Sequence, residues 1–111
     1  MDERVEKWLY DIRFSIEEID SFFHHNERNF EAFCQNLILK RAIERNLEII
    51  GEAINRILSR DGNIAIENAK KIVSLRNHII HSYDNISEET IWAIVINHIP
   101  KLKKEIDGLL S

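Results

Sequence analysis

The chain has 111 residues, of which 44% are hydrophobic and 31% are charged, with three glycines and one proline. These values are typical of one globular domain, here residues 1–111, and disfavour an all-β fold, which needs more turn residues. The net charge of −4 argues against non-specific coating of nucleic acid, although residues 36–80 carry eight basic and five acidic side chains.

Cysteine content and hydropathy restrict the class of protein further. Cys34 is the only cysteine, which excludes an intramolecular disulfide and a zinc site built from several cysteines. The polar N-terminus is unlike a secretory signal, and no apolar run reaches the roughly 18 residues of a membrane span. We therefore expect a cytoplasmic protein without contact to a membrane.

The first half of the chain predicts two helices. Apolar residues recur at spacings of three and four from Val5 to Phe23, which indicates an amphipathic helix from about Asp2 to His24. A second stripe begins at Phe30, shifts slightly in phase near Leu37 and continues to Ile57. It predicts one long helix from about residue 29 to residues 58–60.

The second half predicts two more helices. Asp61-Gly62-Asn63 is a turn signal. A third helix is expected over Ile64–Ile80, with its buried side formed by Ala69, Ile72 and Ile79. The fourth begins at Ser87, whose hydroxyl suits an N-cap, and Pro100 should kink it because proline lacks a backbone donor. Short connections make neighbouring helices antiparallel, so the predicted fold is all-α, an up-and-down four-helix bundle.

A group of polar residues at the end of the third helix does not fit a plain bundle. Arg76 lies four residues after Ile72 and three before Ile79, which are core-facing spacings, and His81 follows five residues later. An arginine fork can hold two phosphate oxygens, and a histidine can move a proton near neutral pH. An ideal helix separates the two by about 140°, so contact requires the long arginine side chain or a helix end near His81.

The same residues have structural interpretations. Arg76 could pair with an acid of the second helix, and His81 could cap the helix C-terminus, where a cation is favoured. The candidate acids are Glu44, Glu48 and Glu52.

A family resemblance favours the catalytic interpretation of Arg76 and His81 over the structural one. The run from Arg76 to Tyr83, Arg-Asn-His-Ile-Ile-His-Ser-Tyr, resembles the R-x4-H-x-Y signature of HepT toxins in the HEPN superfamily. Residues 41–53, Ile91-Trp92 and Pro100-Lys101-Leu102 are also similar to that family. The resemblance implies a HEPN-like bundle and a homodimeric, metal-independent endoribonuclease. It also implies a partner, a minimal nucleotidyltransferase antitoxin of the MntA type.

Roles for individual residues follow from the resemblance. Arg76 and His81 correspond to the catalytic pair, Asn77 to the polar residue that supports it, and Tyr83 to the tyrosine that the antitoxin adenylylates. The expected substrate is RNA, cleaved by its own 2′-hydroxyl to a 2′,3′-cyclic phosphate. No cofactor is expected, and no metal, because His, Cys, Asp and Glu show no ligand spacing.

Two further expectations remain open at this point. The seam with Arg76 and the apolar residues around Trp92 are not fully used in a lone bundle and favour a homodimer. The rival to catalysis is a non-catalytic subunit that binds a nucleotide or substrate for a nucleotidyltransferase. The remaining histidines, His24, His25 and His98, lie in no motif and are expected at a turn or on a helix seam.

Overall fold

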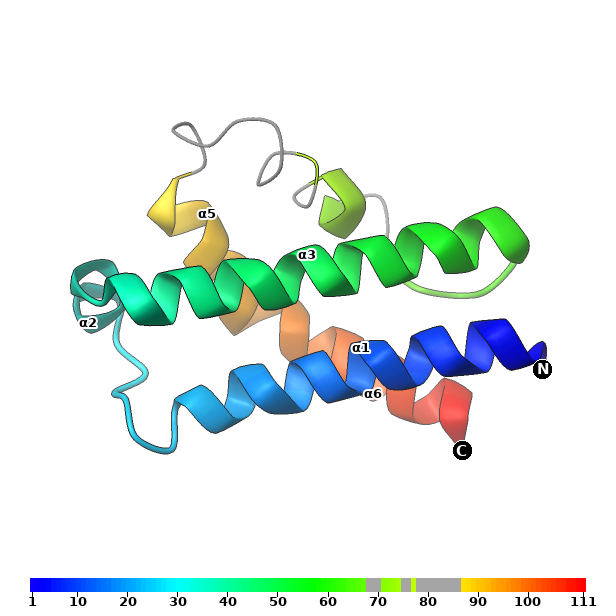
Figure 1. The fold of residues 1–111 in the computed structure, drawn as a ribbon, viewed down its shortest axis with the longest axis horizontal. Coiled ribbons are helices and arrows are strands. Elements are labelled where there is room, and N and C mark those ends of the chain that lie inside the picture. Colours follow the sequence, from blue (N-terminus) through cyan, green and yellow to red (C-terminus); the bar gives the residue numbers. More distant parts are fainter. Residues whose placement is uncertain (68–70, 75–76, 78–86) are drawn as a thin grey trace.

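The computed structural model describes residues 1–67, 71–74, 77 and 87–111, and these residues form helices and turns without any strand (Figure 1). The long helices are α1 (Glu3–Phe22), α3 (Leu37–Arg60) and α6 (Ile99–Leu110). Shorter elements are α2 (Phe30–Gln35), α5 (Glu88–Ala93) and the π-helical turn η1 (Ile94–His98). Residues 71–74 and 77 are also helical. The all-α fold predicted from the sequence is confirmed.

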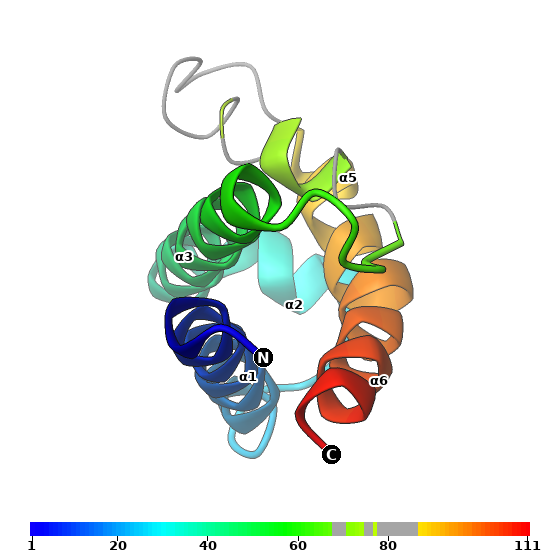
Figure 2. The same cartoon turned by 90° about the vertical axis from the view of Figure 1, so that its right-hand side faces the viewer.

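The helices α1 and α3 lie side by side and run in opposite directions, and α6 lies against α1 across the core (Figure 2). The predicted stripe of α1 is buried, as are nine residues of α3. Hydrophobic burial along these seams is the main stabilising contribution, because apolar surface leaves water in proportion to its area. None of the helices in the described ranges is long and apolar enough to cross a bilayer.

The single long helix expected over residues 29–60 is wrong, because the chain breaks it at Asn36. Asn36 has an extended backbone, with φ −110° and ψ 92°, and it ends α2 and begins α3. Its side-chain oxygen accepts a hydrogen bond from the Leu39 backbone N–H at 3.0 Å, which satisfies one of the free donors at a helix start. The phase shift in the apolar stripe marks this break, and it leaves Leu37 exposed.

The third helix begins later than predicted. Asp61 closes α3 by donating its backbone N–H to the carbonyl of Ile57 at 2.7 Å, as the turn signal indicated. Residues 64–67 are not helical, so the start predicted at Ile64 is wrong. Ile72 is only 1% exposed, as expected of its core-facing position. Ala69 and Ile79 lie outside the described residues.

The fourth helix starts where it was predicted and is irregular before Pro100. The Ser87 hydroxyl accepts the Thr90 N–H at 3.0 Å and caps α5. Around η1 the Ile99 N–H reaches back five residues, to the Ile94 carbonyl. A widened turn of this kind makes room for a proline ring that would otherwise collide with the preceding turn. The irregularity expected from Pro100 therefore takes the form of a π-turn.

Candidate active site

Of the residues that carry the predicted chemistry, the structure describes only Asn77. It is helical and exposed at the surface, and its side chain or backbone is engaged in an interaction. Arg76, His81 and Tyr83 lie outside the described residues. That these four residues meet in one site therefore stays a prediction. The described residues show what precedes and follows the signature in the chain.

On its N-terminal side the signature is preceded by residues fixed to the core and to α6. Ile66 and Ile72 are both buried. The backbone N–H of Glu67 donates to the Glu105 carboxylate, with an N–O distance of 2.7 Å. Figure 2 shows the chain crossing from the end of α3 to α6 at this point. The chain that precedes the signature is thus held against the core at Ile66 and Ile72 and against α6 at Glu67.

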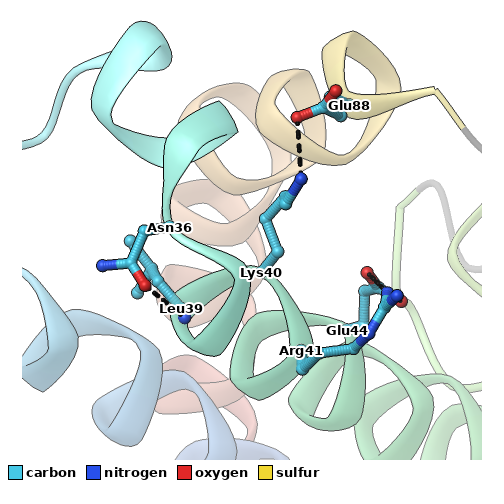
Figure 3. A network of polar contacts seen from close by, with 6 residues as sticks. All are labelled: Asn36, Leu39, Lys40, Arg41, Glu44 and Glu88. Atoms are coloured by element: carbon cyan, nitrogen blue, oxygen red, sulfur yellow. Dashed lines mark hydrogen bonds and ion pairs between the residues drawn. The ribbon is translucent and has the colours of Figure 1, made fainter.

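On its C-terminal side the signature is followed by an ion pair between α5 and α3. Lys40 Nζ lies 3.2 Å from Glu88 Oε2, as Figure 3 shows (Figure 3). The Cys34 thiol also donates to Glu88, and this hydrogen bond, followed by the one from Lys40, lowers the pKa of the Glu88 carboxyl. Glu88 is thereby kept ionised, and α2, α3 and α5 are joined one residue after the Ser87 cap.

The thiol of Cys34 is not activated by this arrangement. Burial, and then its hydrogen bond to the Glu88 carboxylate, raise the pKa of Cys34. A thiolate is the nucleophilic form, and it is favoured by positive surroundings rather than by a neighbouring carboxylate. Cys34 therefore acts as a half-buried donor between α2 and α5.

The three acids considered as partners of Arg76 each pair with an arginine of α3. Glu44 lies 2.8 Å from Arg41 and Glu48 lies 3.4 Å from Arg45. Glu52 lies 3.0 Å from Arg56, and it makes a further interaction as well. These pairs lie along one helix at spacings of three and four residues, which places their side chains on the same surface.

Trp92 is packed inside the chain, which weakens one reason for expecting a dimer. Its ring centroid lies 5.1 Å from that of Phe33, 5.9 Å from that of Phe23 and 6.2 Å from that of Phe30. The cluster joins the end of α1 to α2 and α5. The large exposed apolar side chains lie elsewhere, at Met1, Tyr10, Phe14, Leu37 and Ile38.

His98 occupies an unusual position in the π-turn before Pro100. Its Nδ1 atom is buried and has no hydrogen-bond partner in the part of the chain that the structure describes. Burial lowers the pKa of His98, and the positive charges of Lys71 and Lys101 lower it further. The imidazole is therefore neutral at physiological pH, and the charges of two lysines on different helices act on it.

Comparison with known proteins identifies the family. A family model described as "Ribonuclease HepT-like" matches residues 12–109. This chain belongs to the HepT-like ribonuclease family. It is 36% identical over 105 residues to a "Putative RNase" of Methanocaldococcus jannaschii, covering 93% of this chain and 94% of that protein. It is 32% identical over 103 residues to a "Probable ribonuclease HepT" of Thermococcus cleftensis, covering 92% of each chain. No solved structure matches the chain.

For this HepT-like chain, the sequence did not single out the surroundings of His98. His98 and Lys101 are three residues apart on one helix, a spacing that places them on one face. The spacing of His98 and Lys101 can be read from the sequence. The effect of Lys71 on the pKa of His98 cannot, because it depends on how the two helices pack. In the described ranges, no three His, Cys, Asp or Glu side chains are grouped so that they could hold a metal ion.

Proposed function

We propose that this protein is an endoribonuclease that cleaves RNA without a metal ion, with Arg76 and His81 as its catalytic pair. The observation that carries the proposal is the R-x4-H-x-Y run from Arg76 to Tyr83 in a chain of the HepT-like ribonuclease family. Its relatives are named as ribonucleases, and these names support RNA as the substrate.

The proposed reaction uses only the two side chains and the RNA. His81 takes the proton of a ribose 2′-hydroxyl, whose oxygen then forms a bond to the adjacent phosphorus. The bond from phosphorus to the 5′-oxygen breaks, and that oxygen receives the proton that His81 had taken. The products are a 2′,3′-cyclic phosphate and a 5′-hydroxyl. Arg76 holds the phosphate oxygens and stabilises the charge that develops on them, while Asn77 supports the pair.

The test is an RNA cleavage assay in the presence of EDTA. Purified wild type should cleave, and Arg76→Ala and His81→Ala should each lose nearly all activity while keeping the helical circular dichroism signal. His25→Ala, at an exposed turn position, is the matched control and should cleave like wild type. Loss of cleavage on chelation, or substantial cleavage by His81→Ala, would overturn the mechanism.

The wider proposal is a toxin regulated by a nucleotidyltransferase antitoxin. The antitoxin would transfer the adenylyl group of ATP to the hydroxyl of Tyr83, which loses its proton while pyrophosphate leaves, and this would add a phosphate and considerable bulk near Arg76. That phosphate would compete with the RNA phosphate for the arginine fork. Tyr83→Phe keeps the ring and removes the acceptor oxygen, so it should cleave RNA yet escape silencing by the antitoxin with ATP. Equal silencing of Tyr83→Phe, with no nucleotide mass added, would refute this switch.

We further propose that the active form is a homodimer, in which two copies of the pair lie in one cleft. The exposed apolar side chains Phe14 and Ile38 support an interface better than the packed Trp92 does. One chain has a mass of 13.1 kDa, and light scattering at micromolar concentration should return about twice that value. A mass equal to one chain would contradict the dimer.

A second candidate function, a nucleotide-binding subunit without catalysis, is favoured by the net charge of −4 and by the pairing of many surface cations with acids. In that case wild type would bind a nucleotide and leave RNA intact. The EDTA assay above separates the two functions.

A further inference from the structure

A cavity of about 260 Å³ lies between α1 and α3, and neither the proposed reaction nor the family resemblance assigns it a role. Its apolar lining comes from Trp8 of α1 and from Ile49 and Ala53 of α3. Ligand sites in proteins combine an apolar lining with a few polar groups in this way. The charged side chains that complete the lining are Asp11, Arg45, Glu48, Glu52 and Arg56.

The Trp8 side chain offers a ring that is fixed in place and still accessible. It is half-buried and packs against the core, so little conformational entropy is lost when a ligand covers it. Its indole N–H makes no hydrogen bond with the described residues. A flat ring held in this way is a surface on which another aromatic ring can stack.

The charges that line the cavity are already paired, which restricts the kind of ligand it can take. Paired charges leave little net field, so the cavity disfavours a metal ion or a phosphate, which need unpaired charge of the opposite sign. The carboxylates can still accept hydrogen bonds and the guanidinium groups can still donate them. The cavity therefore suits a flat, uncharged ligand with donors and acceptors on its edge. The pairs are Lys7–Asp11 at 2.7 Å, Arg45–Glu48 at 3.4 Å and Arg56–Glu52 at 3.0 Å.

The size of the cavity fits one ring system. Sites for drug-sized ligands measure roughly 300–1,000 Å³, and the cavity, at about 260 Å³, is smaller than these. A wider groove adjoins it, since Trp8 and Arg56 line both. Ser59 and Arg60 also line this groove, so the more polar remainder of a ligand can lie there in contact with water.

We infer that the cavity binds one unpaired base of the RNA, stacked on Trp8, with the amino group of the base donating to the Glu48 carboxylate. The Arg45–Glu48 pair is the longest of the three and uses one Glu48 oxygen, which leaves the other oxygen to accept. Unpaired RNA bases are recognised by stacking on aromatic side chains and by hydrogen bonds to their edges. Cytosine, adenine and guanine, which carry an exocyclic amino group, are preferred over uracil. The subsite rests on the ribonuclease function proposed above, which makes RNA the ligand.

The first test compares two short 2′-O-methyl RNAs, one made of cytosine and one of uracil. Both lack the attacking hydroxyl and carry equal numbers of phosphates, so a difference in affinity reports the base. By fluorescence anisotropy, wild type should bind the cytosine strand about tenfold more tightly. Trp8→Leu should weaken that binding about tenfold, because it removes the stacking surface. Tyr10→Leu is the matched control, since Tyr10 is an exposed aromatic residue of the same helix outside the cavity lining, and it should bind like wild type. Equal affinities of Trp8→Leu and wild type would refute the subsite.

The second test concerns the Glu48 carboxylate. Glu48→Gln should lose the preference for cytosine, because an amide can donate to the uracil carbonyl as readily as it accepts from the cytosine amino group. Glu44→Gln is the matched control, since Glu44 pairs with Arg41 on the same helix but does not line the cavity. A preference that survives in Glu48→Gln, or that is lost equally in Glu44→Gln, would rule out the proposed contact.

A third measurement keeps Trp8 and does not depend on how well Trp8→Leu folds. The chain has two tryptophans, so Trp92→Phe leaves Trp8 as the only one. Binding of the cytosine strand should quench the Trp8 fluorescence until the site is saturated. Binding that leaves this fluorescence unchanged would contradict stacking on Trp8.

The outcomes for wild type separate this inference from the proposed function. Wild type that cleaves RNA but binds the two strands equally, without quenching of Trp8, would overturn the base subsite alone. Wild type that prefers the cytosine strand but cleaves no RNA would overturn the ribonuclease function and support a base site in a protein that only binds. Wild type that neither binds nor cleaves RNA would overturn both proposals.

Discussion

The α1–α3 pair and the region from η1 to α6 differ in whether their polar groups have hydrogen-bond or ion-pair partners. Along α1 and α3, polar groups have partners: the buried Asn46 amide donates to Glu18 and to the Ala42 carbonyl, and arginines of α3 pair with its glutamates. Around η1, the His98 Nδ1 is buried without a partner in the described ranges, and Lys71 and Lys101 lack acids. The first region pairs these polar groups internally, whereas the second leaves the His98 Nδ1 without a partner among the described residues.

This difference bears on how each region contributes to the stability of the fold. Paired charges on an exposed helix contribute little to stability, but they also leave no net field for a ligand. An unpaired polar group costs stability and persists where function requires it. The experiments below measure how much the packing and the polar groups of these regions contribute to stability.

The largest effect is expected in the core of α3. Ile43 is 0% exposed and Ile38 is 84% exposed, although they lie five residues apart on one helix. Ile43→Ala should lower the free energy of unfolding by about 2–5 kcal/mol, because it removes buried methyl groups and leaves a cavity. Ile38→Ala should change it by less than about 0.5 kcal/mol. Urea denaturation of both variants measures the contrast, and equal losses would disprove the burial assigned to α3.

A smaller loss is expected at the break between α2 and α3. Asn36→Ala removes the cap of α3 and the 3.3 Å hydrogen bond from Asn36 to Asn26, and should cost about 1 kcal/mol. Asn55→Ala, in the exposed part of the same helix, should be close to neutral, since alanine favours helix. If Asn36→Ala is as stable as wild type, the two helices are continuous in solution, as periodicity alone suggested.

Periodicity predicted the first helix, the Ser87 start and the core positions well, because those depend on contacts that repeat every three or four residues. It failed at Asn36, where a side-chain cap competes with helix continuation, and at residues 64–67, which are held by a contact to α6. At Pro100 the sequence predicted a kink, but it did not predict that the irregularity would be a π-turn. The effect of Lys71 on His98 was missed because the two residues are distant in sequence and belong to different helices. The roles of Arg76, His81 and Tyr83 remain predictions.

Ion pairs should give modest effects, both where they join two helices and where they lie within one. Lys40 and Glu88 are 20% and 43% exposed and join α3 to α5. A double-mutant cycle with Lys40→Met and Glu88→Gln should give a coupling of about 0.5–1 kcal/mol, the upper range for a pair open to solvent. The pair Lys7–Asp11, exposed at 69% and 40%, should give about 0.3 kcal/mol. A coupling near zero for Lys40–Glu88 would mean that α5 is held by its apolar contacts alone.

The smallest expected effect is a dependence of stability on pH that comes from one imidazole. Burial, then Lys71 and Lys101, lower the pKa of His98 in the folded protein. In the unfolded chain that pKa returns to about 6.5. Between the two values the unfolded state binds a proton that the folded state does not, so stability falls as pH drops through this window. The lowered pKa values of Asp2 and Glu88 act in the same direction, but at pH below about 4.5.

Urea midpoints measured from pH 8 to pH 5 resolve this contribution. Wild type should lose stability with falling pH more steeply than His98→Gln, which keeps a polar group but does not titrate. His25→Gln, at an exposed turn position, should follow wild type. Lys71→Ala should flatten the dependence in part, because the folded pKa of His98 rises once one positive charge is gone. A wild-type profile that overlays the one of His98→Gln would show that folding does not lower the pKa of His98.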